Sequence, residues 1–229
     1  MMQGLFVTGT DTEVGKTCIS AGLTYALQAR GWRVAPVKPL AAGQALDTQG
    51  RWYNEDVRQL HAVQSLGLSE AEVGPFQWRT ACAPHIAARL EDRPIERAPV
   101  LAAVRASAAK AQLLLVEGVG GFRVPLLPGW DTADLAVDIG LPMLVVVGLR
   151  LGCINHAALT AEALRARGLS LAGWVANTLD PAMPHRDDNL AALQAVLQAP
   201  CWGHVPRLPA PTPAAVATHL TLDHAPAWH

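Results

Sequence analysis

The chain has 229 residues, a length that suits one large α/β domain and is marginal for two. Hydrophobic residues make up 51% and charged residues 16%, so there is ample material for a core, and the composition is not that of a disordered chain. The net charge is -1 and Lys and Arg form no dense cluster, which argues against binding to nucleic acid or to an anionic membrane surface.

In the first half of the chain, apolar runs alternate with segments of helical period. Gly31 ends the first helical segment, and Asn54 is a typical N-cap for the second. Residues 40–53 are rich in Gly, Gln and Asp and predict a long surface loop, and residues 75–99 predict an irregular insertion. In chain order, we expect a strand at residues 4–8, a helix at 16–30, a strand at 34–38, helices at 54–66 and 95–111, and a strand at 112–117.

The second half continues this alternation. Residues 141–148 are apolar without interruption, as expected for a parallel strand that is covered on both faces. The pattern predicts a strand at 141–148, a helix at 152–167, a strand at 171–177, a helix at 187–198 and a short strand at 201–205. The Pro/Ala-rich end is expected to be a loop followed by at most a short helix.

This rhythm predicts an α/β fold of the P-loop NTPase type, with a mostly parallel sheet and helices on both faces. The sequence shows no internal repeat and no domain linker, so we expect a single domain over residues 1–229, in which residues 210–229 form a loosely matching tail.

The first residues enter a strand directly, without the basic segment and cleavage site of a secretory signal, and the longest apolar run is too short to span a bilayer. We therefore expect a cytoplasmic protein with no membrane partner. The cysteines are scattered without a C-x-x-C pair, which indicates reduced thiols, and the histidines form no cluster that would suggest a structural zinc site.

The segment FVTGTDTEVGKT, residues 6–17, joins the first strand to the first helix. In the pattern G-x-x-x-x-G-K-[ST], backbone N–H groups surround the phosphates, the lysine reaches the β/γ-phosphates, and the hydroxyl binds Mg²⁺. Gly15, Lys16 and Thr17 supply the second half of this pattern, but its first glycine, Gly9, comes one residue early. A glycine-rich turn with an accidental Gly-Lys-Thr is the structural alternative. The strand before and the helix after favour a longer loop that binds a nucleoside triphosphate.

Ligands of open α/β sheets bind at the carboxyl ends of the strands, so the residues at other strand ends are informative. Lys38 follows the second strand and is expected beside the loop, although a lysine there is as often merely solvated. Glu117 ends an apolar strand and suits a Mg²⁺ ligand, direct or through water. Three glycines follow, Gly118, Gly120 and Gly121, and they let the backbone approach phosphate. A plain turn would explain these glycines, but it would not explain the acid.

The last two strands offer a site for the base of the nucleotide. Asn177 ends its strand and can form hydrogen bonds with the edge of a purine. The segment Pro206-Arg207-Leu208 follows the last strand and could line the other side of the ring. Each of these signals is weak by itself, and together with the loop they predict one pocket.

These motifs resemble those of the dethiobiotin synthetase family. The segments FVTGTDTEVGKT, KPLAAG, VEGVGGFRVPL, GLRLGCINHAALTAEAL and LAGWVANTLD occur in the order and spacing of that family. The resemblance runs from about Phe6 to Pro206, and several of the motifs are specific to the family rather than to P-loop proteins in general. The tail and residues 75–99 match more loosely.

The resemblance implies a ligase that needs ATP as co-substrate and Mg²⁺ as cofactor. It implies carboxylation and ring closure of 7,8-diaminopelargonate (7,8-diaminononanoate) with CO₂ to dethiobiotin, ADP and phosphate, through a carbamate and a carbamic-phosphoric anhydride. This is phosphoryl transfer, in which positioning and charge neutralisation do most of the catalysis. A homodimer is also implied, since the distal carboxylate of the substrate is bound across a dimer interface in the family.

The resemblance further implies roles for individual residues. Catalytic roles fall to Lys38, Lys16 and Thr12; of these, Lys38 would lie where charge builds between carbamate and γ-phosphate, and Thr12 near the same substrate. Metal ligands would be Thr17, Asp56 and Glu117. The nucleotide would be bound by Glu13, Val14, Gly15, Lys16, Thr17, Cys18, Asp56, Glu117, Gly118, Val119, Gly120, Asn177, Thr178, Pro206, Arg207 and Leu208, and the distal carboxylate by Gly152, Cys153, Ile154 and Asn155, which open a helix.

Two positions depart from the family pattern. Ala42 stands where the family commonly has a hydroxyl-bearing residue, so any contact there must come from the backbone or from water. The segment between Lys38 and the metal-binding aspartate is about one residue longer, which makes Asp56 the aligned choice and Asp47 and Glu55 less favoured substitutes.

Two other classes of P-loop protein remain as alternatives. A partitioning or switch ATPase shares the fold, but such proteins usually carry an additional lysine early in the loop, where this chain has Thr10-Asp11-Thr12. A GTPase metallochaperone would read guanine with N-K-x-D, and the segment NTLD has the Asn and Asp but lacks the lysine. Both alternatives are less favoured than the ligase.

Overall fold

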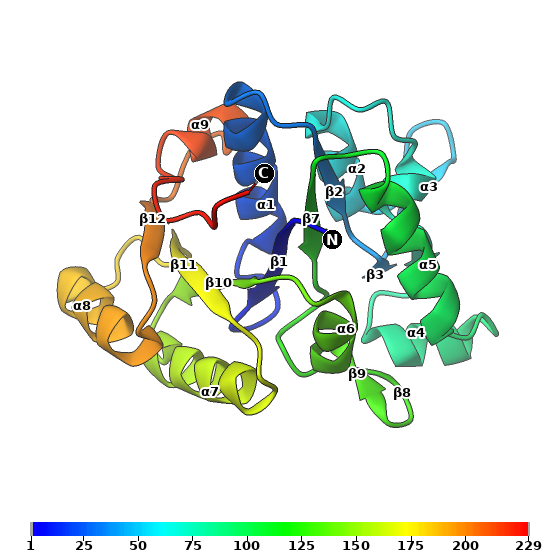
Figure 1. Cartoon of the computed structure of the whole chain (residues 1–229). Coiled ribbons are helices and arrows are strands. Elements are labelled where there is room, and N and C mark those ends of the chain that lie inside the picture. The colour runs from blue at the N-terminus through cyan, green and yellow to red at the C-terminus, as the bar shows by residue number, and fades with distance from the viewer. Residues whose placement is uncertain (1, 229) are drawn as a thin grey trace.

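The computed structural model describes residues 2–228. Its centre is a six-stranded sheet in the order β12-β11-β10-β1-β7-β2, and every neighbouring pair in it is parallel (Figure 1). The strands are β1 (Gly4–Gly9), β2 (Val34–Val37), β7 (Leu113–Glu117), β10 (Met143–Leu149), β11 (Leu171–Thr178) and β12 (Cys201–Val205). The sheet has the mostly parallel α/β architecture that the alternating pattern predicts.

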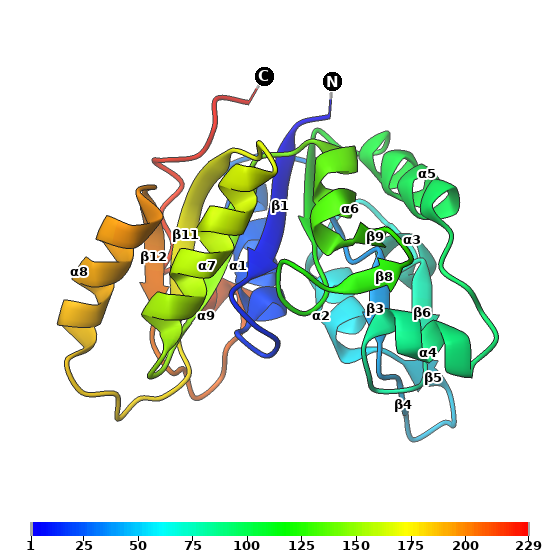
Figure 2. The same cartoon turned by 90° about the horizontal axis from the view of Figure 1, so that it is seen from below.

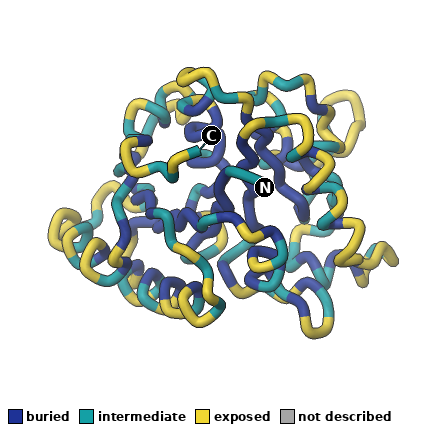
Figure 3. Tube along the Cα trace, viewed as in Figure 1, coloured by how far each residue is buried: buried dark blue, intermediate teal, exposed yellow. Residues whose placement is uncertain are grey.

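Helices cover both faces of this sheet. The side chains of alternate residues in each strand point to opposite faces and pack against different helices. Leu5 and Val7 of β1 pack with α1 (Lys16–Ala29) and α9 (Pro213–Ala217), whereas Phe6 belongs to the core on the opposite face. That opposite face is covered by α5 (Arg97–Ala108), α6 (Thr132–Ile139), α7 (Cys153–Ala166) and α8 (Arg186–Leu197). Figure 2 shows α6 and α7 in front of the sheet, and Figure 3 shows that the buried residues concentrate in the central strands.

The segment expected to be a surface loop at residues 40–53 contains three short strands, so that prediction was wrong in part. They are β3 (Leu40–Ala42), β4 (Ala45–Leu46) and β5 (Trp52–Tyr53). Leu40 and Ala41 are buried because β3 pairs in parallel with β6 (Phe76–Trp78). Only β4 and β5 form an exposed hairpin, with the turn anchored by Asp47.

Residues 75–99, expected to be irregular, also hold regular structure. Besides β6, the segment contains α4 (Pro84–Leu90), and it follows α2 (Glu55–Val63) and α3 (Glu70–Val73). Trp78 is fully buried and its Nε1 donates to the Arg93 carbonyl at 3.0 Å, which fixes the segment against the domain. The expected helix at residues 95–111 begins only at Arg97.

Three further elements were absent from the predictions. The hairpin of β8 (Pro125–Leu127) and β9 (Trp130–Asp131) leads directly into α6. Asp131 caps α6 by accepting hydrogen bonds from Ala133 and Asp134 at 2.9 and 3.0 Å, and Gly140 ends the helix in the left-handed conformation.

Among the helices that the structure describes, none combines the length and the hydropathy needed to cross a membrane.

Candidate functional site

The phosphate-binding loop joins β1 to α1 at the carboxyl end of the sheet. Gly15 is the N-cap of α1 with φ 89°, and a Cβ atom at this position would lie 2.2 Å from Nδ2 of Asn177. That Nδ2 donates to the Val14 carbonyl at 2.9 Å, so β11 holds the loop in place. A glycine cap has no side-chain acceptor, which leaves the first N–H groups of α1 available to an anion.

Lys16 is the first residue of α1 and is buried. Its Nζ donates to the Asp11 carbonyl at 3.1 Å. Burial lowers the pKa of Lys16 from 10.5 to about 8, and the positive charge of Lys38 acts in the same direction, against the attraction of Glu117 and Asp56. A bound triphosphate would supply negative charge close to this ammonium group and so stabilise its protonated form.

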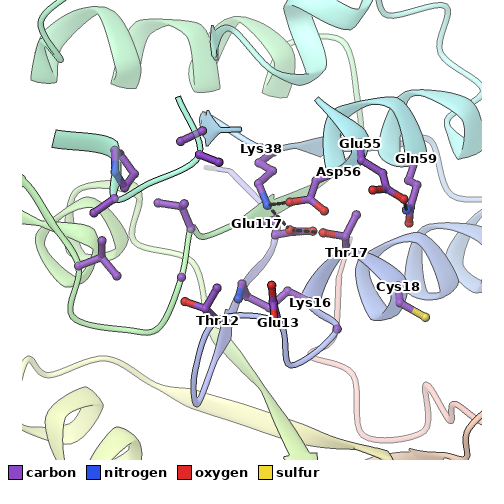
Figure 4. A pocket seen from close by; sticks show the side chains of 18 of the residues that line it. Thr12, Glu13, Lys16, Thr17, Cys18, Lys38, Glu55, Asp56, Gln59 and Glu117 are labelled. Atoms are coloured by element: carbon purple, nitrogen blue, oxygen red, sulfur yellow. Dashed lines mark hydrogen bonds and ion pairs between the residues drawn. The ribbon is translucent and has the colours of Figure 1, made fainter. Parts of the chain in front are cut away.

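A second group of charges lies across the loop and comes from three other segments. Lys38, directly after β2, donates from Nζ to Oδ2 of Asp56 at 2.5 Å and to Oε1 of Glu117 at 2.8 Å. Thr17 of α1 donates from Oγ1 to the same Oε1 at 2.6 Å. Figure 4 shows Lys38 and Asp56 on one side of the cavity, Thr12, Glu13 and Lys16 on the opposite side, and Glu117 and Thr17 between them.

The local structure explains where these side chains lie. Glu117 ends β7, whose partner β1 leads into the loop, with Val7 paired to Glu117. Asp56 lies in the first turn of α2, and Asn54 caps that helix by accepting the N–H of Val57 at 3.2 Å. The first turn of a helix favours a negative charge, so the N-terminus of α2 stabilises the Asp56 carboxylate.

The ion pairs set the charge states of this group. Burial by itself would lower the pKa of Lys38, but the Glu117 and Asp56 carboxylates outweigh it, and the pKa is raised. Burial would raise the pKa of Asp56, but the charge of Lys38 and the hydrogen bond from Lys38 outweigh it, and the pKa is lowered. Lys38 is therefore a fixed positive charge and Asp56 a fixed negative charge at neutral pH.

The oxygen atoms in this group fit Mg²⁺. Glu117 is buried, its Oε1 accepts from Thr17 and Lys38, and its Oε2 has no hydrogen-bond partner within residues 2–228. A hydroxyl and two carboxylates are hard oxygen donors of the kind that Mg²⁺ prefers, with water and phosphate oxygens completing its octahedron. In the same residue range, no group of three His, Cys, Asp or Glu side chains is arranged to hold a metal without such additional ligands.

The loop and the charged group open into one cavity of about 810 Å³. Most of the predicted phosphate, metal and substrate residues line it, namely Thr12, Glu13, Gly15, Lys16, Thr17, Cys18, Lys38, Asp56, Glu117, Val119 and Gly120. Val14 and Gly118 do not line it; Val14 is buried beneath the loop. Ala42 and Glu55 line it as well, whereas Asp47 lies in the β4–β5 turn.

Sequence reasoning missed several cavity residues. They come from α2, from the segment before α4 and from the loop after β7, and are Gln59, Ala81, Cys82, Ala83, Pro84 and Val124. Most of these residues are apolar, and Cys82 had been set aside because the cysteines form no motif, so no residue type marked this segment as part of a site. The only available signal was Pro84, which at the first position of α4 marks the start of a helix.

The residues predicted to hold the base lie outside this cavity. Asn177 pairs in register with Val205, so Pro206, Arg207 and Leu208 leave the sheet beside it. Thr178 Oγ1 and His204 Nε2 form a hydrogen bond of 2.8 Å across β11 and β12. This edge adjoins the loop through the Asn177–Val14 hydrogen bond.

The residues predicted to hold the distal carboxylate also lie outside the cavity. Gly152 is the N-cap of α7 with φ 91°, and Cys153, Ile154 and Asn155 form the first turn. The preceding Leu151 is 95% exposed. An ion pair between Arg150 and Asp11 connects this turn to the phosphate-binding loop.

Three curated relatives cover nearly the whole chain. The ATP-dependent dethiobiotin synthetase BioD of Janthinobacterium sp. (strain Marseille) is 50% identical, over 97% of this chain and 96% of its own. The proteins of the same name from Ralstonia nicotianae and Aromatoleum aromaticum are each 49% identical, over 95% of this chain and 94% and 96% of their own. A family model described as an AAA domain matches residues 3–215.

The similar solved structures share the fold at low sequence identity. A ParA family ATPase from Chlorobium tepidum TLS has a TM-score of 0.54 and 13% identity, over 97% of this chain and 93% of its own. The cell division ATPase MinD from Pyrococcus furiosus has a TM-score of 0.55 and 18% identity, over 91% of this chain and 85% of its own. At such identities the likeness shows the architecture alone.

Proposed function

The chain belongs to the family of ATP-dependent dethiobiotin synthetases, which are ligases, and on this premise we propose that it carboxylates 7,8-diaminopelargonate and closes the ureido ring of dethiobiotin. In this proposal, CO₂ and one amine form a carbamate and release a proton. The carbamate oxygen attacks the γ-phosphorus of ATP, and ADP leaves. The second amine then attacks the carbonyl carbon of the mixed anhydride, expels phosphate and loses a proton.

One observation carries the proposal: Lys16, Thr17, Lys38, Asp56 and Glu117, from segments up to 101 residues apart, meet around a single cavity. Phosphoryl transfer needs little covalent help from the protein and depends on positioning and on neutralising charge. Two buried lysines beside a free helix N-terminus are suited to that task.

Thr17, Asp56 and Glu117 would hold Mg²⁺, and Oε2 of Glu117 supports this role, since it has no hydrogen-bond partner in the described part of the chain. The ion, when bound, would neutralise the charge on the β- and γ-phosphates. Lys16 would bind the β/γ oxygens, with the N–H groups of residues 13–18 around the phosphates. The Lys38 ammonium would lie where the carbamate and the γ-phosphoryl oxygens meet, and Thr12 would contact the reacting end of the diamine.

The remaining roles are proposed from the same family membership. Gly118 and its neighbours in the loop after β7 would contact phosphate. Asn177 and Thr178, with residues 206–208, would hold the base. The first turn of α7, residues 152–155, would offer its N–H groups to the distal carboxylate of a substrate bound across a homodimer interface. A cytoplasmic location is part of the same proposal.

The decisive experiment supplies ¹³C-bicarbonate, the diamine and MgATP to the purified protein. We expect a cyclic urea that carries the label at its carbonyl carbon, with one ADP and one phosphate released for each ring. Omission of the diamine is the control and should abolish both the product and most of the ADP release. ADP release that does not depend on the diamine, with no labelled ring, would favour the switch or partitioning ATPase instead.

A further inference from the structure

An ion pair joins the phosphate-binding loop to the turn before α7. Nη2 of Arg150 donates to Oδ2 of Asp11, although the two residues are 139 positions apart in the sequence. They meet because β1 and β10 are neighbours in the sheet, with Gly9 paired to Val146. Asp11 lies two residues after β1, and Arg150 directly follows β10.

The backbone of Arg150 is held on both sides. The preceding Leu149 is fully buried, and its carbonyl accepts N–H groups from Leu179 at 3.3 Å and Asp180 at 3.2 Å. The Arg150 carbonyl accepts the N–H of Cys153 at 3.0 Å, the first residue of α7. The backbone from which the Arg150 side chain extends is therefore held in place.

Asp11, in contrast, lies in a loop, and its atoms accept three hydrogen bonds. Its Oδ1 accepts the N–H of Thr12 at 2.7 Å, its carbonyl accepts Nζ of Lys16 at 3.1 Å, and its Oδ2 accepts from Arg150. Thr12 and Lys16 both line the cavity. A shift of the Asp11 backbone would thus displace both the adjoining Thr12 and the carbonyl that accepts Nζ of Lys16.

We propose that Arg150 is a positioning residue for the reaction: by fixing the Asp11 carboxylate, it holds the loop backbone at residues 11 and 12, and through that backbone it places Thr12 and the carbonyl that binds Lys16 at the reacting end of the cavity. The side chains of Arg150 and Asp11 are 45% and 41% exposed, and ion pairs of that exposure contribute little to stability. Their effect should therefore be on the geometry of transfer. The inference rests on the proposed function, since Thr12 and Lys16 receive their roles there.

Four variants test this role: Arg150→Ala, Asp11→Asn, the double variant and Arg150→Lys. Asp11→Asn keeps an oxygen atom for the Thr12 N–H while it removes the charge that Arg150 needs. We expect each single loss to lower kcat about 10-fold, with the KM for ATP changed less than about threefold, because misplacement of reacting groups acts on the transfer step. The double variant should be no slower than the slower single variant, and Arg150→Lys should recover most of the rate.

Arg97→Ala is the matched control, because it breaks another exposed arginine ion pair, with Asp138, away from the cavity. Its kinetics should equal those of the wild type. A kcat of Arg150→Ala within twofold of wild type, or single losses that multiply in the double variant, would overturn the proposal. If the wild type released ADP without forming a labelled ring, the proposed function would fail, and the same comparison of ADP release rates would still decide the role of Arg150.

Discussion

Lys38 lies between two carboxylates at 2.5 and 2.8 Å, on the side of the cavity opposite the phosphate-binding loop. Because Lys16 and the N-terminus of α1 would bind phosphate without it in the proposed function, Lys38 should contribute mainly to the transition state. Lys38→Ala is expected to lower kcat about 100-fold or more and to change the Kd for ATP only a few-fold. Rapid-quench turnover and equilibrium nucleotide binding separate the two effects.

Lys110→Ala is a suitable control for this substitution, since Lys110 forms an exposed ion pair with Glu72 and neither residue lines the cavity. It should turn over like the wild type. A Lys38→Ala enzyme that keeps its turnover rate within a few-fold would show that the charge of Lys38 is not used in transfer.

Lys16 leads to a pH-dependent prediction. Burial holds its pKa at about 8 in the free protein, and a bound triphosphate should raise it toward or above its ordinary value of 10.5. At pH 8, binding should take up about half a proton, and at pH 6.5 almost none, because the amine is already charged there. Titration calorimetry in buffers of different ionisation enthalpy measures this uptake, and identical heats in all buffers at pH 8 would contradict it.

At the level of residues, the sequence predicts the site best where the chemistry lies at the ends of strands. Lys38 follows the parallel strand β2 and Glu117 ends the parallel strand β7, and such ends meet at one edge of the sheet. Asp56 lies on a helix, and its prediction as a site residue came from the family resemblance alone. The Asp11–Arg150 pair was not predicted, because no periodicity or motif relates two loop residues from distant parts of the chain.

The tail provides a prediction at the level of elements. Val216 of α9 is fully buried against α1, where a Cβ atom on Gly22 would lie 2.4 Å from its Cγ1. Val216→Ala removes two buried methyl groups and should cost roughly 2 kcal/mol, which corresponds to a Tm lower by roughly 4–8 °C. Calorimetry measures the shift. Val137→Ala, on the exposed side of α6, should change the Tm little, and equal shifts would mean that α9 does not stabilise α1.

The elements that the sequence missed are short or lie in segments with mixed signals. β3 and β6 have three residues each and are defined by pairing with one another, which no local pattern reveals. The helix α6 had a local signal in Asp131 and Asp134, which form a capping box, but the apolar run before it obscured the boundary. The long strands and helices were predictable because their burial on one or two faces imposes a period.

At the scale of the whole molecule, the separation of the two predicted ends of the substrate site is the main feature. The reacting end lies in the cavity with Lys38, whereas the first turn of α7 lies outside it, next to the exposed Leu151. A substrate with a distal carboxylate would therefore reach α7 only across the molecular surface. A second copy of the chain, facing this surface, would enclose that path and bring its own α7 to the cavity.

This arrangement predicts that two inactive variants complement each other. Lys38→Ala damages the reacting end of a site, and Asn155→Asp damages the other end, because its negative charge repels the distal carboxylate that the N–H groups of residues 152–155 would hold. If each site combines Lys38 of one chain with Asn155 of the other, a heterodimer of the two variants holds one doubly damaged site and one intact site. An equal mixture after subunit exchange should then recover about a quarter of the wild-type activity, because half of the dimers are heterodimers with one working site each. If both residues serve a site within one chain, every site in the mixture stays damaged, and activity should not rise above that of the separate variants.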